Sequence, residues 1–177
     1  FKGSASSSGK FTNGNTTNLG IDSGIVLTTG LAQLVLGPNN NSSEGSSFDQ
    51  NDLGYNGDTS LHYLSSQSTY DASVLEFDLT TTVDTILMNY VFGSDEYTTF
   101  VGTPGSGSGF NDVFGFLISG PGYPTLTNIA LVPGTTMPVS VNDVNCLFTN
   151  QQYYVCNEDT LNGFPACPYR SGCPLSN

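Results

Sequence analysis

Two apolar runs that flank an acidic, glycine-rich loop constrain the fold of this chain more than any other feature. The runs cover residues 86–92 and 113–118, and in each of them apolar side chains occupy both faces of a β-strand. Strands that are apolar on both faces are typical of the centre of a two-layer core. If the two runs pair, the carboxylates at the two ends of the loop meet at one end of the sheet. We expect any functional site there.

Further segments with strand character surround this pair. They cover residues 21–29, 31–36, 73–79, 128–132, 137–144 and 152–156. Gly and Pro separate the segments, no long helix is predicted, and only residues 61–64 are undecided between a helical turn and a strand. The sequence therefore predicts an all-β fold, a two-layer antiparallel β-sandwich of jelly-roll type.

The charge balance excludes several classes of partner. The chain of 177 residues carries a formal charge of −12, and its only basic residues are Lys2, Lys10 and Arg170. Binding to nucleic acid or to an anionic membrane surface requires a cationic face, so neither is expected. No run is long enough to span a bilayer. Few charges beside many aromatic and β-branched residues indicate a secreted β protein.

All four cysteines lie near the C-terminal end, at Cys146, Cys156, Cys167 and Cys173. An even number in one loop-like region indicates disulfides formed in an oxidising compartment. Three pairings are open, and we favour Cys146–Cys156 with Cys167–Cys173 because each closes a short loop. Zinc is the alternative, but the spacing lacks CxxC pairs.

Glycosylation and processing are further expectations. Sequons at Asn15, Asn40 and Asn41 would carry glycans in a eukaryotic source. Because the chain begins at Phe1 and not at a methionine, we expect either a processed secreted product or a part of a larger protein.

Six segments carry long motifs, in this order along the chain. They are LGIDSGIVLTTG (19–30), GPNN (37–40), TYDASVLEFDL (69–79), NYVFGSDEY (89–97), FNDVFGFLISGPG (110–122) and NIALVPGTTMPVSVNDVN (128–145). Together they closely resemble the choice-of-anchor L domain, a family of secreted bacterial surface modules with differing C-terminal anchors. The resemblance implies a non-enzymatic β module at the cell surface, and it supplies no ligand or site residues.

The resemblance also suggests how the chain is organised. Residues 1–18 are expected to form an N-terminal arm or edge strand, residues 19–157 the family-like β-sandwich, and residues 158–177 a Cys/Pro-rich segment. Family members usually continue into a further strand with a YDGFT-like motif, which this sequence lacks. Either the strand is replaced by Asn162–Phe164 in altered form, or it is missing. If it is missing, a neighbouring subunit would supply it by donor-strand complementation, with residues 1–20 as the candidate donor.

The acidic loop ends are the candidate metal site. Asp95, Glu96, Asn111 and Asp112 offer the hard oxygen ligands that Ca²⁺ prefers, and we name Ca²⁺ as the candidate cofactor. The alternative is that these side chains cap turns and accept backbone hydrogen bonds, as Asp and Asn often do. No EF-hand-type loop is present.

Aromatic residues near the loop are candidate ligand contacts. Tyr97, Phe100 and Tyr123 would form a sugar-stacking or protein-binding patch, or else close the core. A hydrolase is disfavoured because Asp95 and Glu96 are adjacent and point to opposite faces of a strand. His62 lies in a Leu/Tyr-rich stretch and is expected to be packed, not catalytic.

These observations favour a non-enzymatic extracellular module, an assembling subunit of a cell-surface filament or matrix. The alternative is a Ca²⁺-dependent adhesin module that binds carbohydrate or protein. An isopeptide crosslink would need Lys2 or Lys10, which we expect to be exposed because their context is polar.

Overall fold

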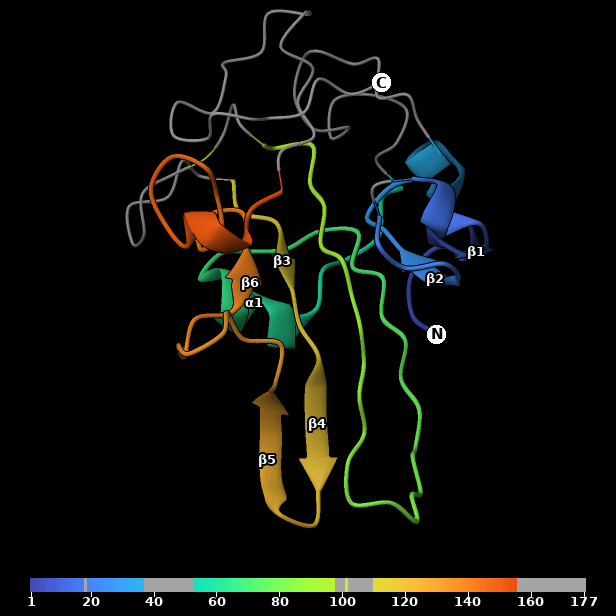
Figure 1. Ribbon diagram of the computed structural model, residues 1–177, viewed down its shortest axis with the longest axis vertical. Coiled ribbons are helices and arrows are strands. Elements are labelled where there is room, and N and C mark those ends of the chain that lie inside the picture. Colours follow the sequence, from blue (N-terminus) through green and yellow to red (C-terminus); the bar gives the residue numbers. More distant parts are fainter. Residues whose placement is uncertain (18, 37–52, 98–100, 102–109, 156–177) are drawn as a thin grey trace, which may run out of the picture. The chain divides into compact units, whose positions relative to one another are not determined.

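A computed structural model of the chain describes residues 1–17, 19–36, 53–97, 101 and 110–155. The chain divides into two compact units, which are described separately. Unit 1 comprises Phe1–Asn40, Ser46–Asp58 and Tyr70–Gly93, and unit 2 comprises Asn41–Gly45, Thr59–Thr69 and Ser94–Asn177. The described part is β-rich with one short α-helix (Figure 1).

Unit 1 is built on a small antiparallel sheet near the N-terminus. Its elements are η1 (Ala5–Ser7), β1 (Ser8–Phe11), η2 (Gly14–Thr16), β2 (Gly24–Leu27) and η3 (Ala32–Leu36). β1 pairs with β2 from Ser8 opposite Leu27 to Phe11 opposite Gly24. The Phe11 ring lies 3.0 Å from where a Cβ on Gly24 would stand, so only glycine lets the ring cover this pair.

The N-terminal segment is paired within its own chain. The backbone N–H of Lys2 donates to the Val74 carbonyl at 2.9 Å, and the Val74 N–H returns a bond to the Lys2 carbonyl at 2.8 Å. Ser7, which is 1% exposed, places its Oγ 3.2 Å from Ser73 Oγ. The expected arm is thus an ordered part of unit 1. To serve as a donor strand it would first have to leave these partners.

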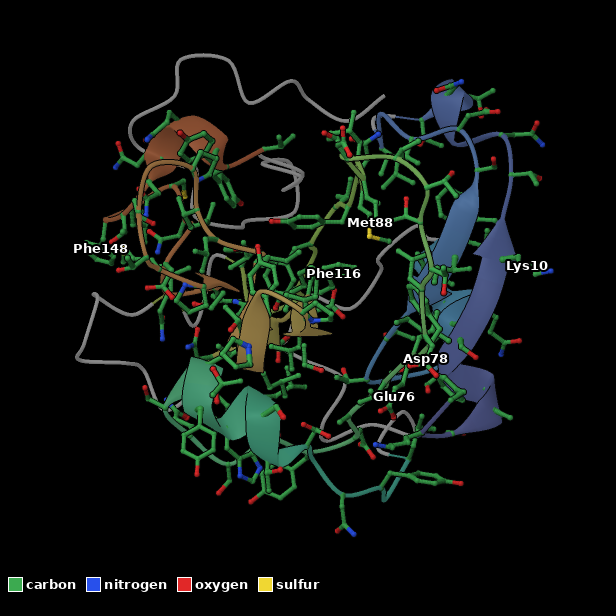
Figure 2. The ribbon with its side chains drawn as sticks, turned by 90° about the horizontal axis from the view of Figure 1, so that it is seen from below. Lys10, Glu76, Asp78, Met88, Phe116 and Phe148 are labelled. Carbon is green, nitrogen blue, oxygen red and sulfur yellow. The ribbon has the colours of Figure 1, made fainter. Side chains whose placement is uncertain are left out.

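Residues 73–79 and 86–92, both expected to be strands, form no strand in the structure apart from the bridge at Val74. Figure 1 shows this part of unit 1 as extended chain without arrows, and bends lie between the two segments at 82–84. Figure 2 labels Glu76, Asp78 and Met88 in this part of unit 1. A β-type sequence becomes a strand only when a second backbone supplies the ladder bonds. Apart from the bridge at Val74, the described residues form no strand ladder with these two segments.

Unit 2 holds the remaining described elements. They are α1 (Thr59–Ser65), β3 (Val113–Phe114), β4 (Leu117–Gly120), β5 (Tyr123–Asn128), β6 (Val139–Ser140) and η5 (Gln151–Tyr153). β4 and β5 form an antiparallel hairpin, visible as the paired arrows in Figure 1. Gly120 and Gly122 flank its turn with φ of 141° and 88°, values that glycine adopts far more easily than other residues.

β3 and β6 form the second sheet of unit 2, with Val113 opposite Ser140 and Phe114 opposite Val139. The most buried apolar residues of unit 2 lie between residues 130 and 154, before, within and after β6. They are Ala130, Val132, Val139, Val141, Cys146 and Tyr154. The core of unit 2 is therefore made mainly by the segment from 130 to 154.

Several segments differ from the prediction in detail. Of the segments predicted as strands at 31–36 and 152–156, residues 32–36 lie in the 3₁₀ helix η3 and residues 152–153 in the 3₁₀ helix η5. The undecided segment 61–64 lies within α1. The 113–118 run is divided at Gly115 between β3 and β4. Local i→i+3 bonds, such as Leu34 N–H to the Leu31 carbonyl at 3.0 Å, satisfy the backbone where no partner strand is present. The two-layer sandwich stays a prediction.

Candidate functional site

The acidic cluster of unit 2 joins the turn at residues 94–97 to the residues that precede β3. Ser94 Oγ donates to Asp112 Oδ2 at 2.8 Å and accepts from the Glu96 backbone N–H at 3.0 Å. The Asp112 N–H in turn donates to Glu96 Oε2 at 3.2 Å. The cluster is therefore a closed set of hydrogen bonds between two segments that lie far apart in the sequence.

The neighbouring Asn111 connects this cluster to α1 and to the residues after β6. Its Oδ1 accepts from the Asn142 N–H at 3.0 Å, and its Nδ2 lies 3.4 Å from the Ser65 carbonyl. The Asp112 carbonyl accepts from the Val141 N–H at 3.0 Å. Residues 111–112 thus connect three parts of unit 2. They bind backbone groups of α1 and of the residues after β6, and the side chains of Ser94 and Glu96 in the turn.

The carboxylates of the cluster are strained electrostatically. Burial, followed by repulsion from the Asp112 carboxylate, raises the pKa of Glu96 to about 7, and the bond from the Asp112 N–H opposes this rise. Burial also raises the pKa of Asp112, with a smaller contribution from the Asp95 carboxylate, against the bond from Ser94. Both shifts have the same main cause, burial of the carboxylates, and the closeness of other carboxylates adds to it.

The structure brings the predicted metal-site residues together, but it shows them as acceptors for backbone and hydroxyl groups. In the described part of the chain, no group of three or more His, Cys, Asp and Glu side chains is placed to hold a metal ion. The oxygens of Glu96, Asp112 and Asn111 are instead engaged with N–H and O–H donors. Calcium binding at this place stays a prediction.

A second polar centre, which the sequence did not single out, lies in the loop that follows β6. The side chain of Asn145 is fully buried, and its Oδ1 accepts from the N–H groups of Leu147, Phe148 and Thr149 at 3.1, 2.8 and 3.4 Å. Its Nδ2 donates to the Val141 carbonyl at 3.1 Å. The Asn/Asp-rich segment 142–150 was the available signal, because such side chains commonly replace backbone partners in tight loops.

The predicted aromatic contacts are placed differently from one another. Tyr97 packs edge-on against Tyr154, with ring centroids 5.0 Å apart, and its hydroxyl donates to the Val144 carbonyl at 2.6 Å. Tyr97 is thus part of the core around Cys146, which was the alternative role predicted for these aromatic residues. Tyr123 begins β5 and is 41% exposed. Phe100 lies outside the described residues.

The remaining predicted residues lie mainly at the surface or outside the described part. Cys146 is disulfide-bonded, and its possible partners Cys156, Cys167 and Cys173 lie outside the described residues, so the pairing stays a prediction. Asn15 is exposed within η2, while the sequons at Asn40 and Asn41 are also outside the described part. Lys2 and Lys10 are exposed, as expected, and Figure 2 shows Lys10 projecting from β1.

Together these features define a β-rich module whose polar centres tie loops together. Comparison with protein families sharpens this description. The chain belongs to the Choice-of-anchor L domain family, whose model matches residues 1–168. This match includes the N-terminal segment and most of the Cys/Pro-rich segment. Comparisons with curated proteins and with solved structures gave no match.

The family defines the protein as a cell-surface-associated or secreted module. Within the described residues, no helix has the length and apolar character needed to cross a membrane.

Proposed function

We propose that this domain is a non-enzymatic structural module that associates with further copies of itself in a cell-surface filament or matrix. The observation that carries the proposal is the pair of extended apolar segments in unit 1, residues 73–79 and 86–92. Large apolar side chains are exposed along both segments. Their exposed fractions are 43% for Leu75, 54% for Phe77, 60% for Leu79, 88% for Leu87 and 53% for Met88.

Exposed apolar segments with β-type sequences favour pairing with another backbone. Among the described residues, no backbone hydrogen bond joins residues 75–79 or 86–89 to a partner strand. Such segments gain ladder bonds and bury apolar area when a second chain adds a strand. A second copy of this chain is the proposed occupant, because the same segment already accepts a β-bridge from Lys2 of its own chain. Pairing of this kind would supply the strands of the expected two-layer sandwich.

The proposal is tested by placing a charge on the apolar segment. Leu87→Lys is not expected to destabilise the single chain, because the side chain is 88% exposed. It should prevent assembly, since a charged group would be buried between copies. Leu36→Lys is the matched control, since Leu36 is 87% exposed in η3 of the same unit.

Electron microscopy and light scattering give the readout. Regular fibres or a mass that grows with concentration are expected for the unmodified protein and for Leu36→Lys, and a monomer for Leu87→Lys. A protein that stays monomeric at every concentration, or a Leu87→Lys variant that assembles normally, would refute the proposal.

The absence of catalysis is part of the proposal. It is supported by the engagement of Glu96 and Asp112 as acceptors of backbone and hydroxyl donors. A screen with chromogenic glycosides and esters is expected to give no turnover. Turnover that Asp112→Asn abolishes in a protein with an unchanged circular dichroism spectrum would identify an enzyme instead.

Calcium-dependent adhesion is the second candidate. Burial and, after it, repulsion from the Asp112 carboxylate raise the pKa of Glu96, and a divalent cation would relieve that repulsion. Addition of EDTA is then expected to lower the melting temperature, and addition of Ca²⁺ to restore it. A melting curve that neither treatment changes would remove calcium from the account.

A further inference from the structure

The helix α1 in unit 2 uses only one of its faces for packing. Leu61 and Leu64 lie toward Gly115, with Leu61 Cδ2 3.4 Å and Leu64 Cδ1 2.8 Å from the position of a Cβ on that glycine. The next residue, Ser65, is buried at 5% exposure. Side chains three and four positions apart share a face of a helix, so Thr59, His62 and Tyr63 fall on another face of α1. That face is distinct from the one that contacts Gly115, and on it Thr59 and Tyr63 are exposed while His62 is half-buried.

A hollow of about 520 Å³ lies against this outer face. It is lined by Thr59, His62, Tyr63, Ser66, Gln67 and Ser68. Among the described residues, the lining contains hydroxyl, amide, imidazole and phenol groups but no carboxylate, lysine or arginine. Such a surface offers donors and acceptors to an uncharged ligand and nothing that would compensate the charge of an ion.

His62 supplies an unsatisfied polar group in the same place. Its Nε2 is buried and has no hydrogen-bond partner in the described part of the chain. A buried ring nitrogen without a partner has lost its bond to water and gained nothing in return. A ligand hydroxyl reached by a rotation of the imidazole ring would satisfy it. The nitrogen therefore favours a ligand rich in hydroxyl groups.

Tyr63 supplies a flat apolar surface beside these polar groups. The residue is 85% exposed, which is unusual for a side chain with a large aromatic ring. A pyranose ring has hydroxyls around its edge and a face of C–H groups, and such a face packs well on an aromatic ring.

The loop after α1 is held in position by Ser65. Its Oγ donates to the Gln67 carbonyl at 2.9 Å and lies 3.2 Å from the Gln67 N. Ser66 adopts a positive φ of 59°, which turns the chain back beside the helix. The backbone of Gln67 is thereby held on the rim of the hollow before any ligand binds, which lowers the entropy cost of binding.

We propose that this hollow is a metal-independent binding site for a neutral saccharide. The site lies apart from the acidic cluster and from the predicted contact at Tyr123. It is independent of the proposed self-association, because it uses neither residues 73–79 nor 86–92.

The proposal is tested by saturation-transfer difference NMR on the whole chain. The probes are cellotriose, maltotriose and chitotriose, each at millimolar concentration, with trigalacturonic acid as the anionic comparison. At least one neutral trisaccharide is expected to give transfer signals in the presence of EDTA, and the anionic one none. Since His62 is the only histidine, its imidazole resonances are expected to shift in the same titration.

Variants of exposed tyrosines locate the site. Tyr63→Ala is expected to weaken binding about tenfold through loss of the stacking surface, whereas Tyr63→Phe, which keeps the ring, retains most of the affinity. Tyr70→Ala is the matched control, because Tyr70 is 74% exposed and lies in unit 1.

Several outcomes would overturn the proposal. They are the absence of binding to all three neutral probes, binding that EDTA abolishes, an equal loss in Tyr70→Ala, and a loss in Tyr123→Ala but not in Tyr63→Ala. Because Leu87→Lys leaves the hollow unchanged, it is expected to bind saccharide even though it does not assemble. The two proposals can therefore fail separately.

Discussion

At the scale of single residues, Glu96 couples the stability of unit 2 to pH. Its folded-state pKa of about 7 lies above the ordinary value of 4.5, so the folded protein holds the proton more tightly than the unfolded chain does. Protonation therefore stabilises the fold, and the stability is lost as the pH rises through the folded-state pKa. The raised pKa of Asp112 acts in the same direction.

The pH dependence is measured as a melting temperature in calcium-free buffer. We expect it to rise as the pH falls from about 7 towards 4.5. Glu96→Gln keeps an acceptor for the Asp112 N–H and removes the charge, so it should raise the melting temperature above pH 7 by no more than roughly 2–4 °C, because solvent screens the group. Asp78→Asn, at an exposed carboxyl, is the control. A melting temperature that rises with pH over this range would contradict the assignment.

Asn145 is the second residue whose role is specific. Its side chain is fully buried and bonds to the backbone on both sides of its loop. Asn145→Ala leaves those carbonyl and N–H groups without partners, so we expect a loss of about 2–4 kcal/mol in the free energy of unfolding. Urea titration followed by fluorescence measures it. Asn89→Ala, at an exposed amide, should change little, and equal effects of the two substitutions would show that Asn145 has no special role.

At the scale of elements, the contact between α1 and Gly115 holds the helix in unit 2. A larger side chain at Gly115 would meet the ends of Leu61 and Leu64, and these side chains or the helix that carries them would have to move. Gly115→Val is therefore expected to cost about 1–3 kcal/mol of stability by overpacking. Gly93→Val is the matched control, because no atom lies within 4 Å of a Cβ at that position. Chemical denaturation measures the free energy of unfolding of both variants. An equal loss in both would show that the replacement of glycine itself, and not overpacking against Leu61 and Leu64, causes the destabilisation.

At the scale of the whole molecule, the net charge opposes the self-association that we propose. Each copy carries a formal charge of −12, so copies repel one another at low ionic strength. The Debye length falls from about 30 Å at 0.01 M salt to about 8 Å at 0.15 M. Assembly should therefore begin at a lower protein concentration as salt is added. Light scattering during a NaCl titration measures this, and assembly that weakens with salt would show that attraction between charges drives it.

Much of the β character could be predicted from the sequence. The 21–29 segment contains β2, and the 113–118 segment contains β3 and the start of β4. The hairpin of β4 and β5 was not predicted, because β5 covers Tyr123–Asn128 and the nearest predicted strand covers residues 128–132. The proximity of Glu96 and Asp112 was also predicted, but the prediction assumed that residues 86–92 pair with residues 113–118. Residues 86–92 form no strand beside 113–118, and hydrogen bonds from Ser94 and from the Asp112 backbone bring the acids together instead.

The sequence by itself determined the family, the β-rich class and the excess of acidic over basic residues, because motifs, periodicity and composition are properties of the chain alone. Tertiary structure alone decided which polar groups meet and which side chains remain exposed. The burial of Asn145, the orphaned nitrogen of His62 and the exposed ring of Tyr63 depend on which segments pack together. Local sequence does not specify such contacts, since the same β-type segment is buried or exposed according to whether a partner strand reaches it.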